Sequence, residues 1–168
     1  MRKVTLFCVA FLAMCCLASC RGPKTNANVY SSTVTVYESD WRWDDVSWRV
    51  DLEYDAINLA VHYDGAVLVY MNNGNTWRQI PMTYYYSVIV EDDNHNTSTL
   101  YCSSSLEVSS YEGGVSIFWT ENDLYNGNRP KDHQFKIVAI SSTDYAARPD
   151  VDYSNYEEVK RVFQIKEK

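Results

Sequence analysis

Two tryptophans two positions apart, Trp41 and Trp43, are the side chains best suited to binding chemistry in this sequence. In an extended segment, residues i and i+2 project to the same side, so the two indole rings would share a face. Their neighbours Asp40, Arg42 and Asp44 are polar. An open face with two indoles would stack against a sugar ring or a peptide. The alternative, favoured because aromatic side chains dominate β cores, is that both rings pack beneath the edge of a sheet.

A second pattern concerns metal binding. Asp92, Asn94 and Asn96 copy the first three ligand positions of a calcium loop, in which alternate oxygens converge on a hard cation. The rest departs from that loop, because position six is Thr97 rather than glycine and position twelve is Ser103 rather than a bidentate glutamate. Asp and Asn are also ordinary turn formers between strands. The sequence therefore predicts a turn here and no metal site.

Catalytic patterns are weak. The histidines His62, His95 and His133 lie far apart and lack the spacing of a zinc site. The serines occur without a GxSxG, SxxK or Cys-His signature. The acidic pair Asp44-Asp45 would serve glycoside hydrolysis only with a suitable carboxylate separation in a cleft. We therefore predict no catalytic residue and no cofactor, and a hydrolase is the last of three functional hypotheses.

Composition narrows the class of protein. The chain has 168 residues and a net charge of −7 without basic clusters, which argues against nucleic acid and against electrostatic binding to anionic lipid. Five Trp and fourteen Tyr, all after residue 20, are typical of β-structure. Beyond Cys20 the only cysteine is Cys102, which we expect to be a buried small residue rather than a reactive thiol.

The first twenty residues carry the pattern of a bacterial export signal. Arg2 and Lys3 precede the apolar run Val4 to Ala18, whose 15 residues fall short of the roughly 17–25 that a spanning helix needs. The run ends in the lipobox Leu17-Ala18-Ser19-Cys20. We therefore predict cleavage before Cys20 and acylation of its thiol, which would attach the protein to a membrane by lipid alone.

These signals divide the chain into three parts. Residues 1–19 are the predicted lipoprotein signal peptide, residues 20–28 a lipidated tether and residues 29–168 a single β-sandwich domain. The 149 residues that remain after cleavage are enough to bury a core without a disulfide or a metal.

Alternation of apolar and polar residues predicts short strands almost without a break. The predicted strands are residues 33–37, 48–54, 57–63, 66–71, 76–80, 84–90, 100–108, 115–120 and 135–140. With turns every 8–12 residues and no βαβ alternation, the pattern indicates an antiparallel, immunoglobulin-like β-sandwich. The last strand is continuously apolar, so we expect it at the centre of a sheet.

Two local signals refine this prediction. Asp64-Gly65 lies between two apolar runs and predicts a hairpin in which Gly65 has φ > 0 and His62 lies on the polar face of its strand. Ser154-Asn155-Tyr156-Glu157 matches a capping box and predicts a short C-terminal helix over residues 154–163.

Several features recur in an order shared with a known group. They are Trp41, Trp48, Ile57, residues 64–70, Trp77-Arg78-Gln79-Ile80-Pro81, residues 135–140 and residues 156–160. The arrangement resembles small Bacteroides-type lipoproteins of unknown function, which implies a β-sandwich of the cell envelope and carries over no functional residues. Surface lipoproteins of such bacteria often have acidic residues soon after the cysteine. Here no acid occurs before Glu38, which favours the periplasmic face of the outer membrane.

The first functional hypothesis is therefore a non-enzymatic binding or interaction module for a glycan or a peptide, held at the membrane by Cys20. Its candidate platform is Trp41 with Trp43. The second hypothesis is a structural or accessory subunit of an envelope or fimbrial assembly, with a protein partner.

Overall fold

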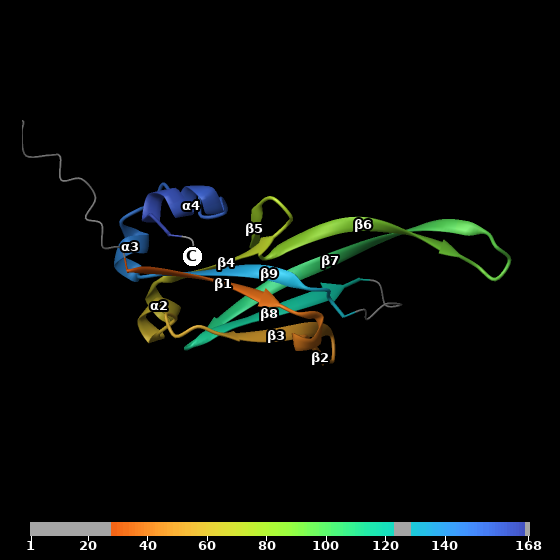
Figure 1. Cartoon of the computed structure of the whole chain (residues 1–168), viewed down its shortest axis with the longest axis horizontal. Coiled ribbons are helices and arrows are strands. Elements are labelled where there is room, and N and C mark those ends of the chain that lie inside the picture. The colour runs from red at the N-terminus through yellow and green to blue at the C-terminus, as the bar shows by residue number, and fades with distance from the viewer. Residues whose placement is uncertain (1–27, 123–128, 167–168) are drawn as a thin grey trace, which may run out of the picture.

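Alternating side chains build two antiparallel sheets that pack face to face, as the computed structural model shows (Figure 1). The structure describes residues 28–122 and 129–166. The predicted signal peptide, Cys20 and all of the predicted tether except Asn28 lie outside the described residues. Within the described ranges, no helix has the length and apolar character to span a membrane.

Sheet A contains four strands in the order β1-β9-β4-β5. Their bounds are Val29–Val36 for β1, Ala66–Asn72 for β4, Trp77–Ile80 for β5 and His133–Ile140 for β9. Strand β9 pairs with β1 on one side and β4 on the other, so the prediction that it is central is confirmed. Its continuous apolar run reflects burial of both faces of the sheet.

Sheet B contains five strands in the order β2-β3-β8-β7-β6. Their bounds are Arg42–Asp44 for β2, Ser47–Glu53 for β3, Met82–Glu91 for β6, Thr97–Tyr111 for β7 and Gly114–Glu121 for β8. The short strand β2 was not predicted. Pro81, which the sequence places at the end of a strand, lies where the chain leaves sheet A after β5 and enters sheet B at β6.

The predicted antiparallel β-sandwich is confirmed. The first strand pairs with the last one, β1 with β9, rather than with the next strand along the chain. The likeness to immunoglobulin domains therefore lies in the two-sheet architecture, and the order of strands is different.

Two hydrophobic cores lie on the two faces of sheet A. The first fills the space between the sheets, and its largest members include Trp41, Phe135 and Ile137. The second lies on the outer face, where Tyr70, Val138 and Ile140 pack with the C-terminal helix α4, Tyr156–Phe163. Full burial of each such side chain stabilises the fold by roughly 1.5–3 kcal/mol.

Helix α4 confirms the predicted C-terminal helix, with a start two residues later. The N-cap is Asn155 rather than Ser154, because the Asn155 side chain accepts hydrogen bonds from the backbone N–H groups of Glu157 and Glu158. Ser154 instead donates its hydroxyl to Asp152 at 2.6 Å.

The predicted strand 57–63 and its Asp64-Gly65 hairpin are wrong. These residues contain helix α2, Leu59–Asp64, with the Asn58 side chain as N-cap on Val61 N at 3.0 Å. Ile57 and Val61 are buried, whereas Leu59, which a strand would place on the same face, is half exposed. Gly65 is the C-cap with φ −95°, so it is not left-handed.

His62 is therefore not on the polar face of a strand. It lies in α2, partly buried, and its Nδ1 forms a hydrogen bond with the Ser110 hydroxyl at 3.1 Å. Gly65 is required for a different reason from the one predicted. A Cβ at this position would collide with the carbonyl oxygen of Ile140 and lie 2.9 Å from that of Val61.

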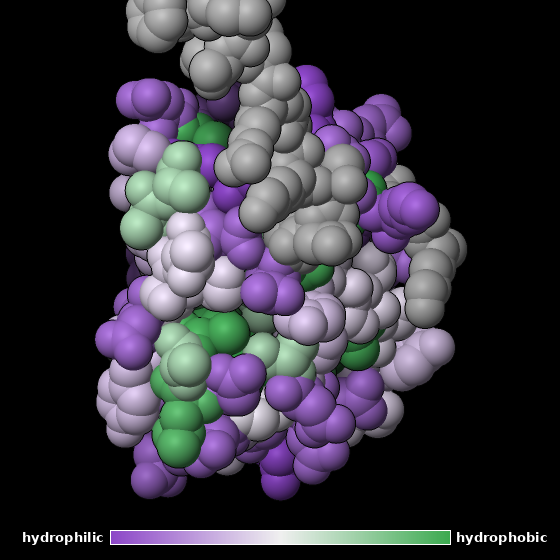
Figure 2. All heavy atoms as spheres, turned by 90° about the vertical axis from the view of Figure 1, so that its left-hand side faces the viewer, coloured by the Kyte–Doolittle hydropathy of each residue, from purple (hydrophilic) through white to green (hydrophobic). Residues whose placement is uncertain are grey.

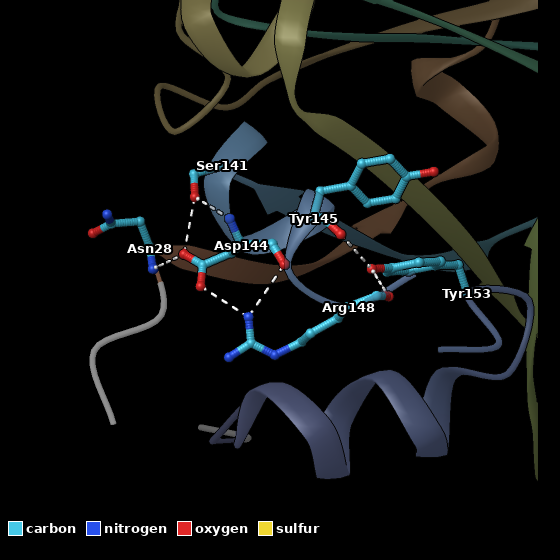
Figure 3. A network of polar contacts seen from close by, with 6 residues as sticks. All are labelled: Asn28, Ser141, Asp144, Tyr145, Arg148 and Tyr153. Carbon is cyan, nitrogen blue, oxygen red and sulfur yellow. Dashed lines mark hydrogen bonds and ion pairs between the residues drawn. The ribbon is translucent and has the colours of Figure 1, made fainter. Parts of the chain in front are cut away.

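A polar network closes the helical end of the sandwich, where α3, Ser142–Ala146, meets the first described residue (Figure 3). The Asp144 carboxylate accepts hydrogen bonds from Asn28 N, the Ser141 hydroxyl and Arg148 Nη1 at 2.9–3.0 Å. The Arg148 guanidinium also lies 4.8 Å from the centre of the Phe163 ring on α4. The same end, seen in Figure 2, is mostly polar, and its apolar side chains gather in the lower part of the view, where α2 lies.

Candidate aromatic binding cleft

The structure separates the two tryptophans of the predicted platform. Trp41 is 1% exposed and packs edge-to-face with Trp119 and Phe135 in the core, so the alternative of burial beneath the sheet is correct for this ring. Trp43 is 53% exposed on edge strand β2. Neither possibility holds for both rings, because the favoured burial is found for Trp41 only and the open platform would keep Trp43 alone. Trp41 follows the 3-10 turn Glu38–Asp40 and enters the sandwich, whereas Trp43 lies on β2, an exposed edge strand of sheet B.

Trp43 belongs instead to a row of three indoles across sheet B. It pairs with Trp48 on β3, which pairs with Trp119 on β8, and cross-strand partners share a face. Trp43 and Trp48 meet edge-to-face with centroids 5.3 Å apart. Exposure falls along the row from the open Trp43 through the partly buried Trp48 to Trp119, which is 4% exposed.

A cleft of about 480 Å³ adjoins the buried end of this row. Its lining residues are Glu38, Tyr84, Trp119, Glu121, Arg129, Pro130, Lys131 and His133. The Arg129 guanidinium lies 5.2 Å from the centre of the Trp48 ring and also lines the cleft, so it joins the two. The name "aromatic cleft" is used below for these lining residues together with Trp43 and Trp48.

Both sheets contribute to the cleft wall. His133, the first residue of β9, stacks on Trp119 with ring centroids 4.9 Å apart and an interplanar angle of 24°. Burial lowers the pKa of His133, against a smaller opposing effect of Asp132. The imidazole is therefore neutral at neutral pH and contributes a polar ring without a charge.

Glu121 is the acceptor at the centre of the wall. Its carboxylate accepts hydrogen bonds from Tyr86 Oη at 3.0 Å, Trp119 Nε1 at 3.1 Å and the Ser104 hydroxyl at 3.3 Å. Burial and the hydrogen bond to Glu121 raise the pKa of Tyr86 to about 12, so its hydroxyl keeps its proton and remains a donor. Three donors from three strands hold the Glu121 oxygens in fixed positions.

Charged residues of both signs form the rim. Lys131 Nζ lies 2.9 Å from the Glu38 carboxylate, and the Glu38 backbone N–H donates to Asp132. The rim thus combines acceptors and donors with little net charge. Sequence reasoning did not select Glu121, Arg129, Lys131 or His133. The last three are close in the chain, but they form no recognised motif, and the fold brings them to Glu121.

Asp92, Asn94 and Asn96, the three residues that match a calcium loop, lie far from the cleft at the tip of the β6–β7 hairpin. Asp92 Oδ1 accepts hydrogen bonds from the backbone N–H groups of Asn94 and Asn96 at 2.9 and 2.8 Å, which is the geometry of an Asx turn. Among the described residues, no group of three or more His, Cys, Asp or Glu side chains is placed to hold a metal.

A second cavity, of about 500 Å³, borders sheet A and the segment after α4, and Trp77 and Lys136 are among the residues that line it. The Lys136 ammonium already lies between the rings of Trp77 and Tyr156, at 4.4 and 4.3 Å, and donates to the Tyr156 hydroxyl. These contacts consolidate the packing of α4, so the aromatic cleft is the better candidate for a ligand site.

No protein-family model, curated protein or solved structure matches this chain. The resemblance to small Bacteroides-type lipoproteins stays a prediction, and function is argued from the geometry of the aromatic cleft.

Proposed function

We propose that this protein is a lipid-anchored, non-enzymatic binding module of the bacterial envelope and that its aromatic cleft binds a glycan. This proposal rests on the row of three tryptophans, whose exposure falls from Trp43 to Trp119, beside the hydrogen-bonded carboxylate of Glu121. A sugar ring has apolar C–H faces that pack on an indole and hydroxyls that need well-placed donors and acceptors. Trp43 supplies an open ring, while Glu121 and Arg129 supply acceptor and donor groups.

The charge pattern favours a neutral glycan over a charged ligand. The acids Glu38 and Glu121 are matched by the cations Arg129 and Lys131 among the lining residues. The hydroxyls of a glycan can form hydrogen bonds with both the acidic and the basic side chains. An ionic ligand would be attracted by the side chains of one charge and repelled by those of the other. A peptide, the other ligand class, is an outcome that the experiment below distinguishes.

The engagement of Glu121 supports binding rather than hydrolysis. A general acid or base must exchange a proton with the substrate, and the Glu121 oxygens are already hydrogen-bonded to Tyr86, Trp119 and Ser104. The carboxylate therefore acts as a structural acceptor that positions the cleft wall.

The position of the tether suits this role. Asn28, at the end of the predicted tether, enters at the helical end beside Asp144, whereas His133 pairs with Val36 at the opposite end of β1. The eight residues of β1 span about 26 Å. A lipid on Cys20 would hold the helical end toward the outer membrane, with its periplasmic face as the proposed location, and direct the cleft away from it.

A glycan array tests the binding proposal with full-length protein in detergent. Trp43→Ala should weaken binding of the recognised glycan by about 1–3 kcal/mol, a value borrowed from the stacking of bases on aromatic side chains. Tyr63→Ala, which removes an even more exposed ring on α2, should leave binding unchanged.

Three outcomes would contradict the proposal. Equal glycan binding by wild type and Trp43→Ala would place the site elsewhere. Binding to a peptide array and to no glycan would make the ligand a peptide. Glycan turnover abolished by Glu121→Gln would make the protein a hydrolase.

The anchor is tested by Cys20→Ala. Loss of the acylation site should move the protein from the detergent phase to the aqueous phase or leave it uncleaved. Mass spectrometry of the wild-type N-terminal peptide should show the added lipid. Detergent partitioning that is the same in both proteins, with no mass shift, would exclude lipidation.

A role as an accessory subunit of an envelope assembly is the second candidate function. The observation in its favour is the exposed β6–β7 hairpin, which extends beyond the rest of the sandwich (Figure 1).

A further inference from the structure

The β6–β7 hairpin continues past the end of sheet B as a two-stranded arm. The last pairing of β7 with β8 is Ser104 with Glu121, and from there to the tip β6 and β7 continue as partners of each other (Figure 1). Within the described residues, β6 is the edge strand of sheet B along its whole length. Two-stranded ribbons are marginally stable in water, so such an arm gains from a further strand.

The edge of β6 lacks the features that normally protect an edge strand. Residues 82–90, MTYYYSVIV, contain no charge, proline or glycine. Large side chains are exposed on the outer face of the arm, where Tyr85 is 84%, Ile89 78% and Tyr101 80% exposed. The backbone groups along this edge and the apolar side chains beside it fit an added antiparallel strand.

We propose that the occupant is β6 of a second copy of this chain, paired antiparallel about a two-fold axis at Ser87. In this register Tyr85 of each copy lies opposite Ile89 of the other. The same symmetry places Tyr86 opposite Val88 and Tyr84 opposite Val90. Aromatic residues opposite β-branched ones are among the stabilising cross-strand pairs, so the strand is its own complement.

Charge also favours this pairing over parallel association. Each chain carries a net charge of −7, and the acidic tip of the arm begins at Glu91. About the axis at Ser87, Glu91 lies opposite the uncharged Thr83 of the other copy. The two Glu91 side chains are then separated by about 27 Å along the strands, beyond the roughly 8–10 Å over which charges interact at physiological salt.

A charge swap at the axis tests the proposal. Ser87 is exposed, so a longer side chain there extends into solvent in the single copy. Sedimentation equilibrium of the full chain in density-matched detergent should show a dimer. Ser87→Lys and Ser87→Glu should each raise the dimer dissociation constant at least tenfold, because like charges then lie directly opposite. An equimolar mixture of the two variants should form a heterodimer.

The matched control is Thr99→Lys. Thr99 is exposed and pairs with Ile89, so its side chain lies on the same face of the arm but on the strand away from the axis. This variant should dimerise like wild type.

A monomeric wild-type protein at every concentration tested would overturn the proposal. So would a dimer that Ser87→Lys leaves intact, or a mixture of the two charge variants that stays monomeric while both melt like wild type. Glycan binding reads out separately, because Ser87 lies outside the aromatic cleft and Trp43 lies outside the arm.

Discussion

The two sheets of this sandwich differ in how many of their faces are covered. Sheet A is buried on both faces, by sheet B on one side and by α4 on the other. Sheet B is buried on its inner face only, and its outer face carries Arg49, Asp51 and Ser116 in a hydrogen-bonded group. The proposed pairing edge therefore lies on sheet B, and the proposed cleft is built largely from sheet B, with His133 of sheet A in its wall.

Lys136 shows that sheet A encloses even a charged side chain. It interrupts the apolar run of β9, and its side chain is 3% exposed on the face beneath α4. Its ammonium is held by the rings of Trp77 and Tyr156. On sheet B the corresponding cation, Arg49, forms ion pairs with Asp51 and Asp44 in partial contact with solvent. The same kind of residue is enclosed on one sheet and hydrated on the other.

The largest difference in mutational destabilisation is expected between a tyrosine on sheet A and a tyrosine on sheet B. Tyr70, fully buried on the outer face of sheet A, packs on Tyr156 and donates its hydroxyl to Tyr153 O at 2.6 Å. Tyr70→Ala should cost about 3–5 kcal/mol in free energy of unfolding, the range for removal of a buried aromatic ring. Tyr101→Ala, on the outer face of sheet B, should change it by less than about 0.5 kcal/mol. Urea unfolding measures both, and equal costs would show that α4 does not bury sheet A.

The next effect concerns Gly65, where α2 meets sheet A. Gly65→Val should lower the free energy of unfolding by about 1–3 kcal/mol, because its Cβ would collide with the Ile140 carbonyl. Gly65→Asn separates this cause from a left-handed turn, in which Asn is tolerated. Thermal melting should show Asn to be as destabilising as Val. A wild-type melting temperature for Gly65→Asn would mean that the conformation of Gly65, not the close approach, makes glycine necessary.

A smaller effect is expected at the cap of α4. Asn155→Ala should cost about 1 kcal/mol, because two N–H groups lose their acceptor. Ser154→Ala is the matched control, since Ser154 bonds Asp152 outside the helix. Chemical unfolding should rank Asn155→Ala as the more destabilising. The reverse order would restore Ser154 as the cap that the sequence pattern predicts.

The strands of both sheets, except the short edge strand β2, could be predicted because their patterns are local. From Phe135, strand β9 is apolar except for Lys136, and β3 shows strict alternation; these are the patterns of doubly and singly buried sheets. Helix α2 was missed because Ile57 and Val61 fit both a period of two and a spacing of four. The Asn58 cap was the signal that could have decided between them.

The cleft was predictable only in part. Trp43 was a candidate because it lies two residues from Trp41 among polar neighbours, but this local pattern predicted the same environment for both rings. Glu121 ends β8, Arg129 lies just before β9 and His133 begins β9. The packing of the two sheets brings these residues into one cleft, where Arg129 also lies over Trp48. Trp119 and Glu121 are two residues apart, so the sequence alone places both side chains on one face of a strand. This spacing was a local signal for an aromatic ring next to a hydrogen-bond acceptor.

The smallest expected effect is the acid sensitivity of the two carboxylate networks. Burial alone would raise the pKa of Asp144, but hydrogen bonds from Ser141 and the Asn28 backbone outweigh it, and the net pKa lies below the ordinary 3.8. On sheet B, burial of Asp51 is likewise outweighed, by Ser116 and Arg49, so its pKa is also lowered. A carboxyl whose folded-state pKa is depressed contributes stability that is complete above its unfolded pKa and is lost as pH falls through its folded pKa. Unfolding free energy should therefore decline below about pH 4, and Asp144→Asn and Asp51→Asn should each flatten the decline by up to about 1 kcal/mol.

High salt should weaken the contribution of the Asp51 network to stability more than that of the Asp144 network. The two cations paired with Asp51, Arg49 and Arg42, are 40% and 73% exposed, whereas Asp144 and Arg148 are both mostly buried at the helical end. At 1 M salt the screening length falls to about 3 Å, which weakens exposed pairs far more than buried ones. In acid titrations at 1 M NaCl, the difference between Asp51→Asn and wild type should shrink to what the Ser116 hydrogen bond contributes, while Asp144→Asn should keep more of its flatter profile. If salt removes both differences equally, the helical end of sheet A is as accessible to solvent as the bare face of sheet B, and the contrast between the sheets does not extend to their charges.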